Sequence, residues 1–237
     1  MPSGSYQGLD NKDAHSKKRA GPSAYMENMV ADVAEALRRL VNAGEEACVK
    51  AKERKSAFDL NMFMKRTYVV VSPSFPTGCS IPCYAQHERR IVFPSPTSGN
   101  IRGFLRLMCV GSRLAPECLI VALIYVNRLC NGKRAVRLSS RNWLPIAMVS
   151  LLTASKVWED NPTWNGAFAQ LFPPVTLRGL NQLESTFHAQ LQFNLQISES
   201  VYNKYLEMLQ GIQKHRKKRG KMQIESQSSR IIATKAR

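Results

Sequence analysis

Residues 98–212 form a series of apolar, helix-forming segments separated by short stop signals, and this pattern constrains the fold most strongly. The apolar residues recur at three- and four-residue spacing, which places them on one face of a helix. Asn142 and Thr176 stand where N-caps are expected, and Asn131-Gly132 and Pro173-Pro174 are typical helix ends. Because the connections are only a few residues long, the sequence predicts a compact all-α domain.

Five helices are expected in this domain, one of them central and buried. The second is apolar nearly all round, which implies burial on several sides. Asn100 can cap the first helix, and Pro116 begins the second. Pro145 lies in the first turn of the third helix, where a missing N–H is tolerated. The fourth helix is short, from Thr163 to Phe172. The fifth has an expected apolar stripe of Leu177, Leu180, Leu183, Phe187 and Leu191.

The chain divides into four regions around this pattern. Residues 1–23 are rich in Gly, Ser and Lys and are expected to be disordered. Residues 24–97 combine a helix over about 24–56, with an apolar stripe between Met26 and Val41, and a Pro-rich connecting segment. Residues 98–212 hold the five helices and a sixth from about Ser198 to Ile212, and residues 213–237 are expected to form a basic, disordered tail.

Lys156 is the one charged residue in the apolar run from Leu151 to Trp158. An isolated buried ammonium group is costly, so a lysine in this position needs partners. Those partners can lie within the protein, where an ion pair would brace two helices, or on another molecule.

The residues around Lys156 carry a family resemblance. Ala154-Ser155-Lys156 closely resembles the central helix of the cyclin box. Leu180–Leu195 is similar to the fifth cyclin-box helix, with Glu184 three residues before a core aromatic, Phe187. The resemblance covers roughly residues 98–212 and implies a single five-helix cyclin box with flanking N- and C-terminal helices.

Other segments resemble one branch of that family. Leu114–Leu129 is similar to the second helix of cyclin Y and Pho-type cyclins, and Trp158 and Trp164 around an Asp-Asn turn fit the same branch. Many cell-cycle cyclins have an acid in this second helix, paired with an arginine of the first helix. Here the acid is replaced by Asn127, and Arg102 is the candidate arginine, so the pair cannot be ionic.

The resemblance implies a non-catalytic regulatory subunit that binds and activates a cyclin-dependent protein kinase. In cyclins, the residues matching Lys156 and Glu184 contact main-chain groups at one end of the kinase's regulatory helix. The partner implied is a PCTAIRE-like or PFTAIRE-like kinase, or a Pho-type partner. Arg102, Asn127, Trp158 and Trp164 are candidates for a supporting interface.

No constellation for catalysis, cofactor binding or metal binding stands out in the sequence. It has no Gly-rich phosphate loop, no His-Glu-x-x-His run and no nucleophile elbow, so no small-molecule substrate or cofactor is expected. Cys79, Cys83 and His87 are loosely spaced and have no convincing fourth ligand, which disfavours a zinc site. Ser72 and Ser95 each precede a proline and are either phosphorylation sites or ordinary loop residues.

The formal net charge of +17 is concentrated toward the C-terminus. A candidate localisation signal consists of Lys214, Arg216, Lys217, Lys218, Arg219 and Lys221. The alternatives are a solvated tail and a contact with nucleic acid or anionic lipid. Binding to nucleic acid is the weaker alternative, because the run has no aromatic residues on which bases could stack. The alternative function is a helical adaptor that uses basic surfaces, such as Arg134, Arg137 and Arg141, to bind nucleic acid or protein.

Membrane attachment is not expected. The longest apolar run, Cys118–Val126, is shorter than the roughly 20 residues that span a bilayer. Met1 is followed by no apolar signal segment, and Pro2 replaces the glycine required for myristoylation. These features, with six cysteines that are expected to be reduced, predict an intracellular protein of the nucleus or cytoplasm.

Overall fold

The computed structural model describes residues 23–51, 58, 70–71, 83–84, 95–132 and 135–235. The helices in this part of the chain are α1 (Ala24–Ala51), α2 (Ser98–Gly111), α3 (Glu117–Asn131), α4 (Trp143–Trp158), α5 (Asn165–Leu171), α6 (Leu177–Gln190) and α7 (Glu199–Lys235). Two short strands, β1 (Val70–Val71) and β2 (Cys83–Tyr84), pair in antiparallel orientation. Apart from this pair the described architecture is helical, so the predicted all-α class is confirmed.

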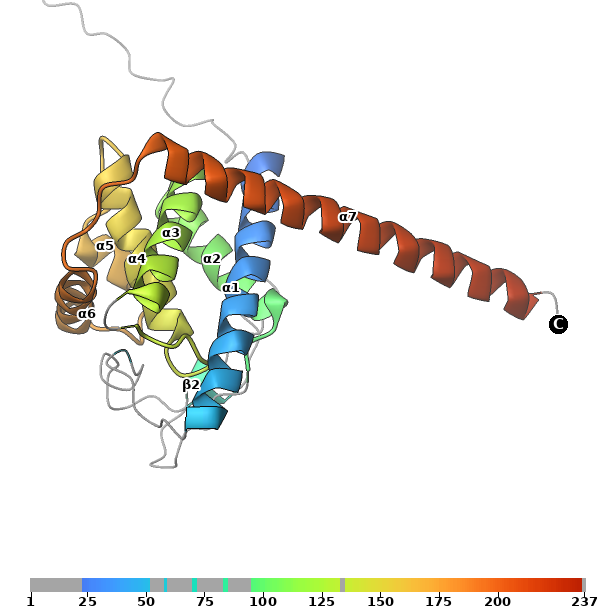
Figure 1. Cartoon of the computed structure of the whole chain (residues 1–237), viewed down its shortest axis with the longest axis horizontal. Helices are drawn as coiled ribbons and strands as arrows, with labels where there is room; N and C mark the ends of the chain where they lie inside the picture. Colours follow the sequence, from blue (N-terminus) through green and yellow to red (C-terminus); the bar gives the residue numbers. More distant parts are fainter. Residues whose placement is uncertain are drawn as a thin grey trace, which may run out of the picture.

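Helices α3 and α4 form the centre of the domain (Figure 1). Every residue from Cys118 to Val126 is buried, and so is every residue from Trp143 to Ser155. This burial confirms that the second predicted helix is enclosed on several sides, and α4 is enclosed in the same way. It also explains their composition, because a helix with no solvent-facing side must be apolar all round.

Helix α1 packs across α2, α3 and α7 and adds its own apolar stripe to the core. Its predicted stripe is buried between Met26 and Val41 except for Leu40, which is only partly buried, and the described part of the helix reaches Ala51. Close to its end, Gly44 lies against the backbone of Leu138, where a Cβ atom would collide with the Leu138 carbonyl. Glu45 supports this contact, since its Oε1 accepts a hydrogen bond of 3.0 Å from the backbone N–H of Ser140.

Side chains cap two of the core helices. Thr97, not Asn100, is the N-cap of α2: its Oγ1 accepts from the Asn100 N–H at 3.1 Å, while Asn100 Oδ1 accepts from the Thr97 N–H at 2.9 Å. The prediction that Asn100 caps this helix was therefore wrong, because Asn100 serves as the third helical residue of a capping box. Thr176 caps α6 as predicted. Asn142 precedes α4, but its Oδ1 accepts from the Ser139 N–H instead.

Two expectations about buried and ordered segments were wrong. Leu177, expected in the apolar stripe of α6, is 46% exposed because it is the first residue of the helix. The expected disordered tail is helical as far as Lys235, since α7 continues well past Ile212. This segment is rich in Lys, Arg and Gln, which have high helix propensity. Figure 1 shows the end of α7 extending away from the helical body.

Candidate functional site

Lys156 and Glu184 form an ion pair between two core helices. Lys156 lies in the last turn of α4 and Glu184 near the middle of α6, and Lys156 Nζ is 2.6 Å from Glu184 Oε1. The Lys156 side chain is 33% exposed, and that of Glu184 is 15% exposed. The structure thus brings together the two principal residues predicted from the sequence, and it keeps them at the protein surface.

Asn165 completes this pair from a third helix. Its Nδ2 donates a 2.8 Å hydrogen bond to Glu184 Oε2 and another to Asn181 Oδ1, also at 2.8 Å. Both carboxylate oxygens of Glu184 therefore have a partner, which fixes the orientation of the group. This role was not apparent from the sequence, because Asn165 at the start of the short helix α5 resembles an ordinary helix-terminal residue.

The electrostatics of this cluster favour an ionised Glu184. Partial burial would raise the pKa of its carboxyl, but hydrogen bonds from Asn165 and Lys156 outweigh that effect and hold the pKa below its ordinary value. One turn further along α6, burial lowers the pKa of His188, assisted by Lys156 and opposed by Glu184. His188 Nε2 lies 3.1 Å from Thr153 Oγ1, so this histidine is a packing residue between α6 and α4.

Apolar side chains flank the ion pair at the surface. Val157 and Trp158 follow Lys156 directly and are exposed, as is Trp164 at 67%. The Trp158 ring stacks on Tyr202 of α7 with ring centroids 5.2 Å apart. The Trp164 ring lies close to the backbone of Gly166, leaving no room for a Cβ atom there. The combination of an exposed ion pair and neighbouring aromatic surface is typical of a protein-binding site.

Arg102 and Asn127, the other predicted interface residues, do not contact each other. Arg102 Nη2 lies 3.3 Å from Glu27 Oε2 of α1, next to a second ion pair between Glu27 and Arg106. Asn127 donates to the Tyr205 hydroxyl of α7 and accepts from Asn131. Each residue therefore joins the α2–α3 region to a flanking helix.

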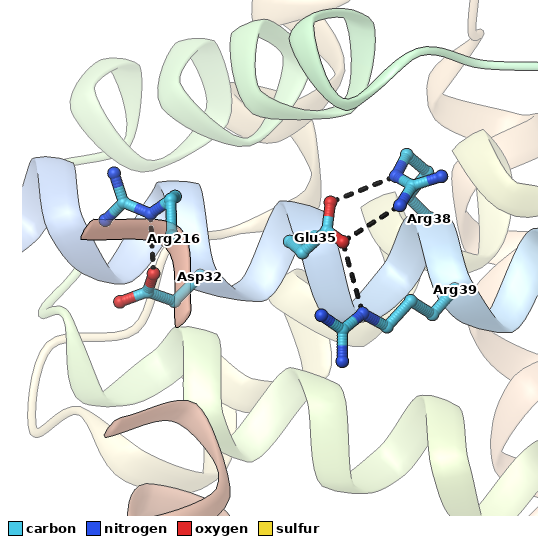
Figure 2. Close-up of polar contacts among 5 residues, drawn as sticks. All are labelled: Asp32, Glu35, Arg38, Arg39 and Arg216. Carbon is cyan, nitrogen blue, oxygen red and sulfur yellow. Dashed lines mark hydrogen bonds and ion pairs between the residues drawn. The ribbon is translucent and has the colours of Figure 1, made fainter. Parts of the chain in front are cut away.

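The residues of the predicted localisation signal lie on α7. The first part of this basic segment packs beside α1. Lys214, Lys217, Lys218 and Arg219 are exposed. Arg216 is instead held by α1: its Nε is 3.0 Å from Asp32 Oδ1, and its Nη2 is 3.3 Å from Asn28 Oδ1. Figure 2 shows the Asp32–Arg216 pair beside the Glu35 carboxylate that binds Arg38 and Arg39. Asp32 was not anticipated from the sequence. Its position between the apolar pairs Val30-Ala31 and Val33-Ala34 of α1 was the signal available.

The remaining predicted features are only partly covered by the structure. Burial raises the pKa of Cys109 to about 12 and also raises that of Cys118, so both thiols are poor nucleophiles. Ser95 is exposed just before α2, whereas Ser72, Cys79, His87 and Arg134 lie outside the described residues.

No group of three His, Cys, Asp or Glu side chains in the described part of the chain is placed to hold a metal ion. None of the described helices is long and apolar enough to cross a membrane.

Most of the chain matches a known protein family. A family model described as Cyclin matches residues 27–195, which run from the first turn of α1 to just beyond α6. The match includes most of α1, which precedes the five predicted core helices, and it contains both Lys156 and Glu184.

Proposed function

Because the chain belongs to the cyclin family, whose members are typically regulatory and non-catalytic, we propose that it binds and activates a cyclin-dependent protein kinase. The observation that carries this proposal is the exposed Lys156–Glu184 ion pair, positioned by Asn165. The family match and the position of this pair support docking on the kinase's regulatory helix.

The pair retains hydrogen-bonding capacity for a partner. A lysine ammonium group has three donors, and within the described structure Lys156 uses one of them on Glu184. The Glu184 carboxylate accepts one hydrogen bond at each oxygen and has further lone pairs. Lys156 can therefore donate to unpaired carbonyl groups of a partner helix, while Glu184 accepts from N–H groups.

Activation follows from where the partner helix is pushed. A kinase is active when a glutamate of its regulatory helix pairs with the lysine that positions ATP. Docking on α4 and α6 supplies the binding energy that holds the helix inward, in the paired state. Asn127 replaces the acid of many cell-cycle cyclins, so the proposed partner is a PCTAIRE-like, PFTAIRE-like or Pho-type kinase.

Affinity purification of the full chain from its native cell, followed by mass spectrometry, identifies any kinase partner. Binding and activation are then measured with that kinase for Lys156→Ala and Glu184→Ala. Each variant should weaken binding by about 1–3 kcal/mol, because truncation leaves polar groups of the partner unsatisfied. Arg38→Ala is the matched control, since it removes one side of the Arg38–Glu35 ion pair on α1, away from α4 and α6.

The controls separate docking from bracing. Normal affinity in correctly folded Lys156→Ala and Glu184→Ala proteins would contradict docking at this pair. If both variants unfold while their folded fraction binds normally, the pair serves as an internal brace between α4 and α6. We also propose that the basic part of α7 directs the protein to the nucleus or to an anionic surface, independently of kinase binding.

A further inference from the structure

A second surface lies on a different part of the molecule, where α1, α3 and α7 meet. These helices enclose an open, mainly apolar groove with a volume of about 770 Å³. Its apolar lining includes Leu40 of α1, Leu123 of α3, and Met208 and Ile212 of α7. In Figure 1, α1 and α6 lie on opposite sides of the helical body, so this groove is separate from the Lys156–Glu184 pair.

The groove has the length and regularity to receive a helix. On α7 its lining residues run from Lys204 to His215, about 16 Å at 1.5 Å per residue. Ala36, Leu40 and Ala43 line the α1 side at helical spacing. A partner helix that fits such a groove presents apolar side chains at i, i+3, i+4 and i+7.

The middle of the groove is open to solvent. Met208 is 43% exposed although it lines an apolar surface. A Cβ atom added at Gly211 would meet no other atom within 4 Å. A bound apolar side chain could therefore occupy the space above Gly211 and cover Met208, which would remove apolar surface from water.

Positive charge and one hydroxyl donor surround this apolar surface. Lys204 is exposed at one end of the α7 side, and Arg39, whose guanidinium group also pairs with Glu35, is exposed on the α1 side. The Tyr205 hydroxyl accepts a hydrogen bond from Asn127, so its own O–H can donate to a bound group. The groove rim formed by Lys204, Arg39 and the Tyr205 hydroxyl can bind carboxylate groups of a partner.

The charge of the chain's own remaining segments does not match this rim. Residues 1–22 contain four Lys or Arg against two Asp, and residues 52–94 contain seven Lys or Arg against three Asp or Glu. Both segments are thus basic. Electrostatic complementarity favours an acidic segment of another protein as the occupant.

We propose that the α1–α3–α7 groove binds a short amphipathic helix of another protein, with apolar residues on one face and Asp or Glu beside them. The groove shares no residue with the Lys156–Glu184–Asn165 cluster. A protein held there can be brought to the complex while α4 and α6 remain available, as a substrate or regulator of the assembly would require.

The test uses the full chain and a fluorescent peptide of about 14 residues, with Leu at i, i+3, i+4 and i+7 and Glu at flanking positions. Fluorescence anisotropy measures its binding at about 0.15 M salt, where long-range attraction to a basic protein is screened. A scrambled peptide of the same composition and a version with Lys in place of Glu are the peptide controls. The Leu/Glu peptide should bind more tightly than both.

Two glycines of α7 provide a matched pair of variants. Gly211→Phe fills the groove, whereas Gly220→Phe adds the same side chain on the same helix beyond it, and a Cβ atom meets no atom within 4 Å at either position. Gly211→Phe should weaken peptide binding by about tenfold, and Gly220→Phe should leave it unchanged. Binding to the kinase should be the same for both variants.

Several results would overturn the proposal. Equal binding of the scrambled peptide, or equal effects of Gly211→Phe and Gly220→Phe, would show a non-specific charge interaction. If analytical ultracentrifugation finds a dimer that Gly211→Phe dissociates, the occupant is a second copy of this chain rather than an acidic partner. Loss of kinase binding in Gly211→Phe alone would instead assign the groove to the kinase.

Discussion

Asp32 of α1 and Arg216 of α7 form an ion pair that joins positions 184 residues apart in the sequence, with a distance of 3.0 Å between Oδ1 and Nε. The Asp32 side chain is only 5% exposed, whereas that of Arg216 is 39% exposed. Asn28 binds the same guanidinium group (Figure 2 draws the Asp32 contact). This pair attaches the start of the basic segment of α7 to α1.

Removing the arginine should cost more stability than neutralising the acid. Arg216→Ala leaves a buried carboxylate without its cation, and we expect the free energy of unfolding to fall by about 1–3 kcal/mol. Asp32→Asn keeps an oxygen that can accept from Arg216 and should be milder. Urea denaturation followed by circular dichroism measures both, with Lys217→Ala as the neighbouring control. Equal effects of Arg216→Ala and Lys217→Ala would contradict this role for the pair.

The same acid predicts a pH dependence. Burial raises the pKa of Asp32 above its ordinary value of 3.8, although Arg216 and Lys217 act in the opposite direction. Because the folded state then holds the proton more tightly, the contribution of Asp32 to stability is complete below pH 3.8 and is lost as pH rises through the folded pKa. The free energy of unfolding of the wild type should therefore fall relative to that of Asp32→Asn as the pH rises from 3.8 through the folded-state pKa of Asp32. A constant difference from pH 3 to pH 7 would contradict it.

Glu184 should show the opposite sign. Its pKa is lowered from 4.5, since hydrogen bonds from Asn165 and Lys156 outweigh the effect of burial. Its contribution is therefore present above pH 4.5 and is lost as pH falls through the folded pKa. The stability difference between wild type and Glu184→Gln should shrink in acid, and Asn165→Ala should move the change to higher pH. A difference that grows in acid would contradict this assignment.

The two exposed tryptophans near Lys156 should behave differently. Trp158→Ala removes the stacked contact with Tyr202 and should lower the free energy of unfolding by about 0.5–1.5 kcal/mol. Trp164→Ala should change it by less than about 0.5 kcal/mol because the side chain is largely exposed. If Trp164 belongs to the kinase interface, its removal should weaken kinase binding instead. Denaturation and binding assays on the same samples decide between these roles.

The basic residues of α7 should affect location rather than activation. Replacing Lys217, Lys218 and Arg219 with Ala keeps a helix-forming sequence, so circular dichroism should be unchanged. The variant should be redistributed in cells but should activate the kinase normally at about 0.15 M salt, where exposed charges are screened over roughly 8 Å. Unchanged distribution with a large loss of activation would place α7 in the kinase interface.

The core helices could be predicted because their signals are local. Periodic apolar residues identified α3 and α4 as buried helices, and Thr176 was recognisable as a cap because the signal lies within one turn. Lys156 and Glu184 were identified as site residues from a family resemblance and, for Lys156, from its unusual position in an apolar run. By contrast, the choice between Thr97 and Asn100 as the α2 cap depended on a reciprocal pair of hydrogen bonds, and both residue types are suitable caps.

The features that were missed depend on contacts distant in the sequence. Asn165 gains its role only when α5 and α6 bring it to Glu184, 19 residues away. The length of α7 was underestimated because its basic segment has no apolar stripe, which is the usual signal of a helix that packs on a core. High helix propensity and the contact between Arg216 and Asp32 act in place of that stripe.

The continuous helix of α7 fixes both the reach and the direction of its far end. From Arg216 to Lys235 it extends about 29 Å, and each residue turns it by about 100°. Two residues inserted after Gly220 would lengthen it by only about 3 Å but rotate its end by more than half a turn. Seven would add about 10 Å and nearly restore the original direction. A binding function that depends on orientation should tolerate the longer insertion better than the shorter one.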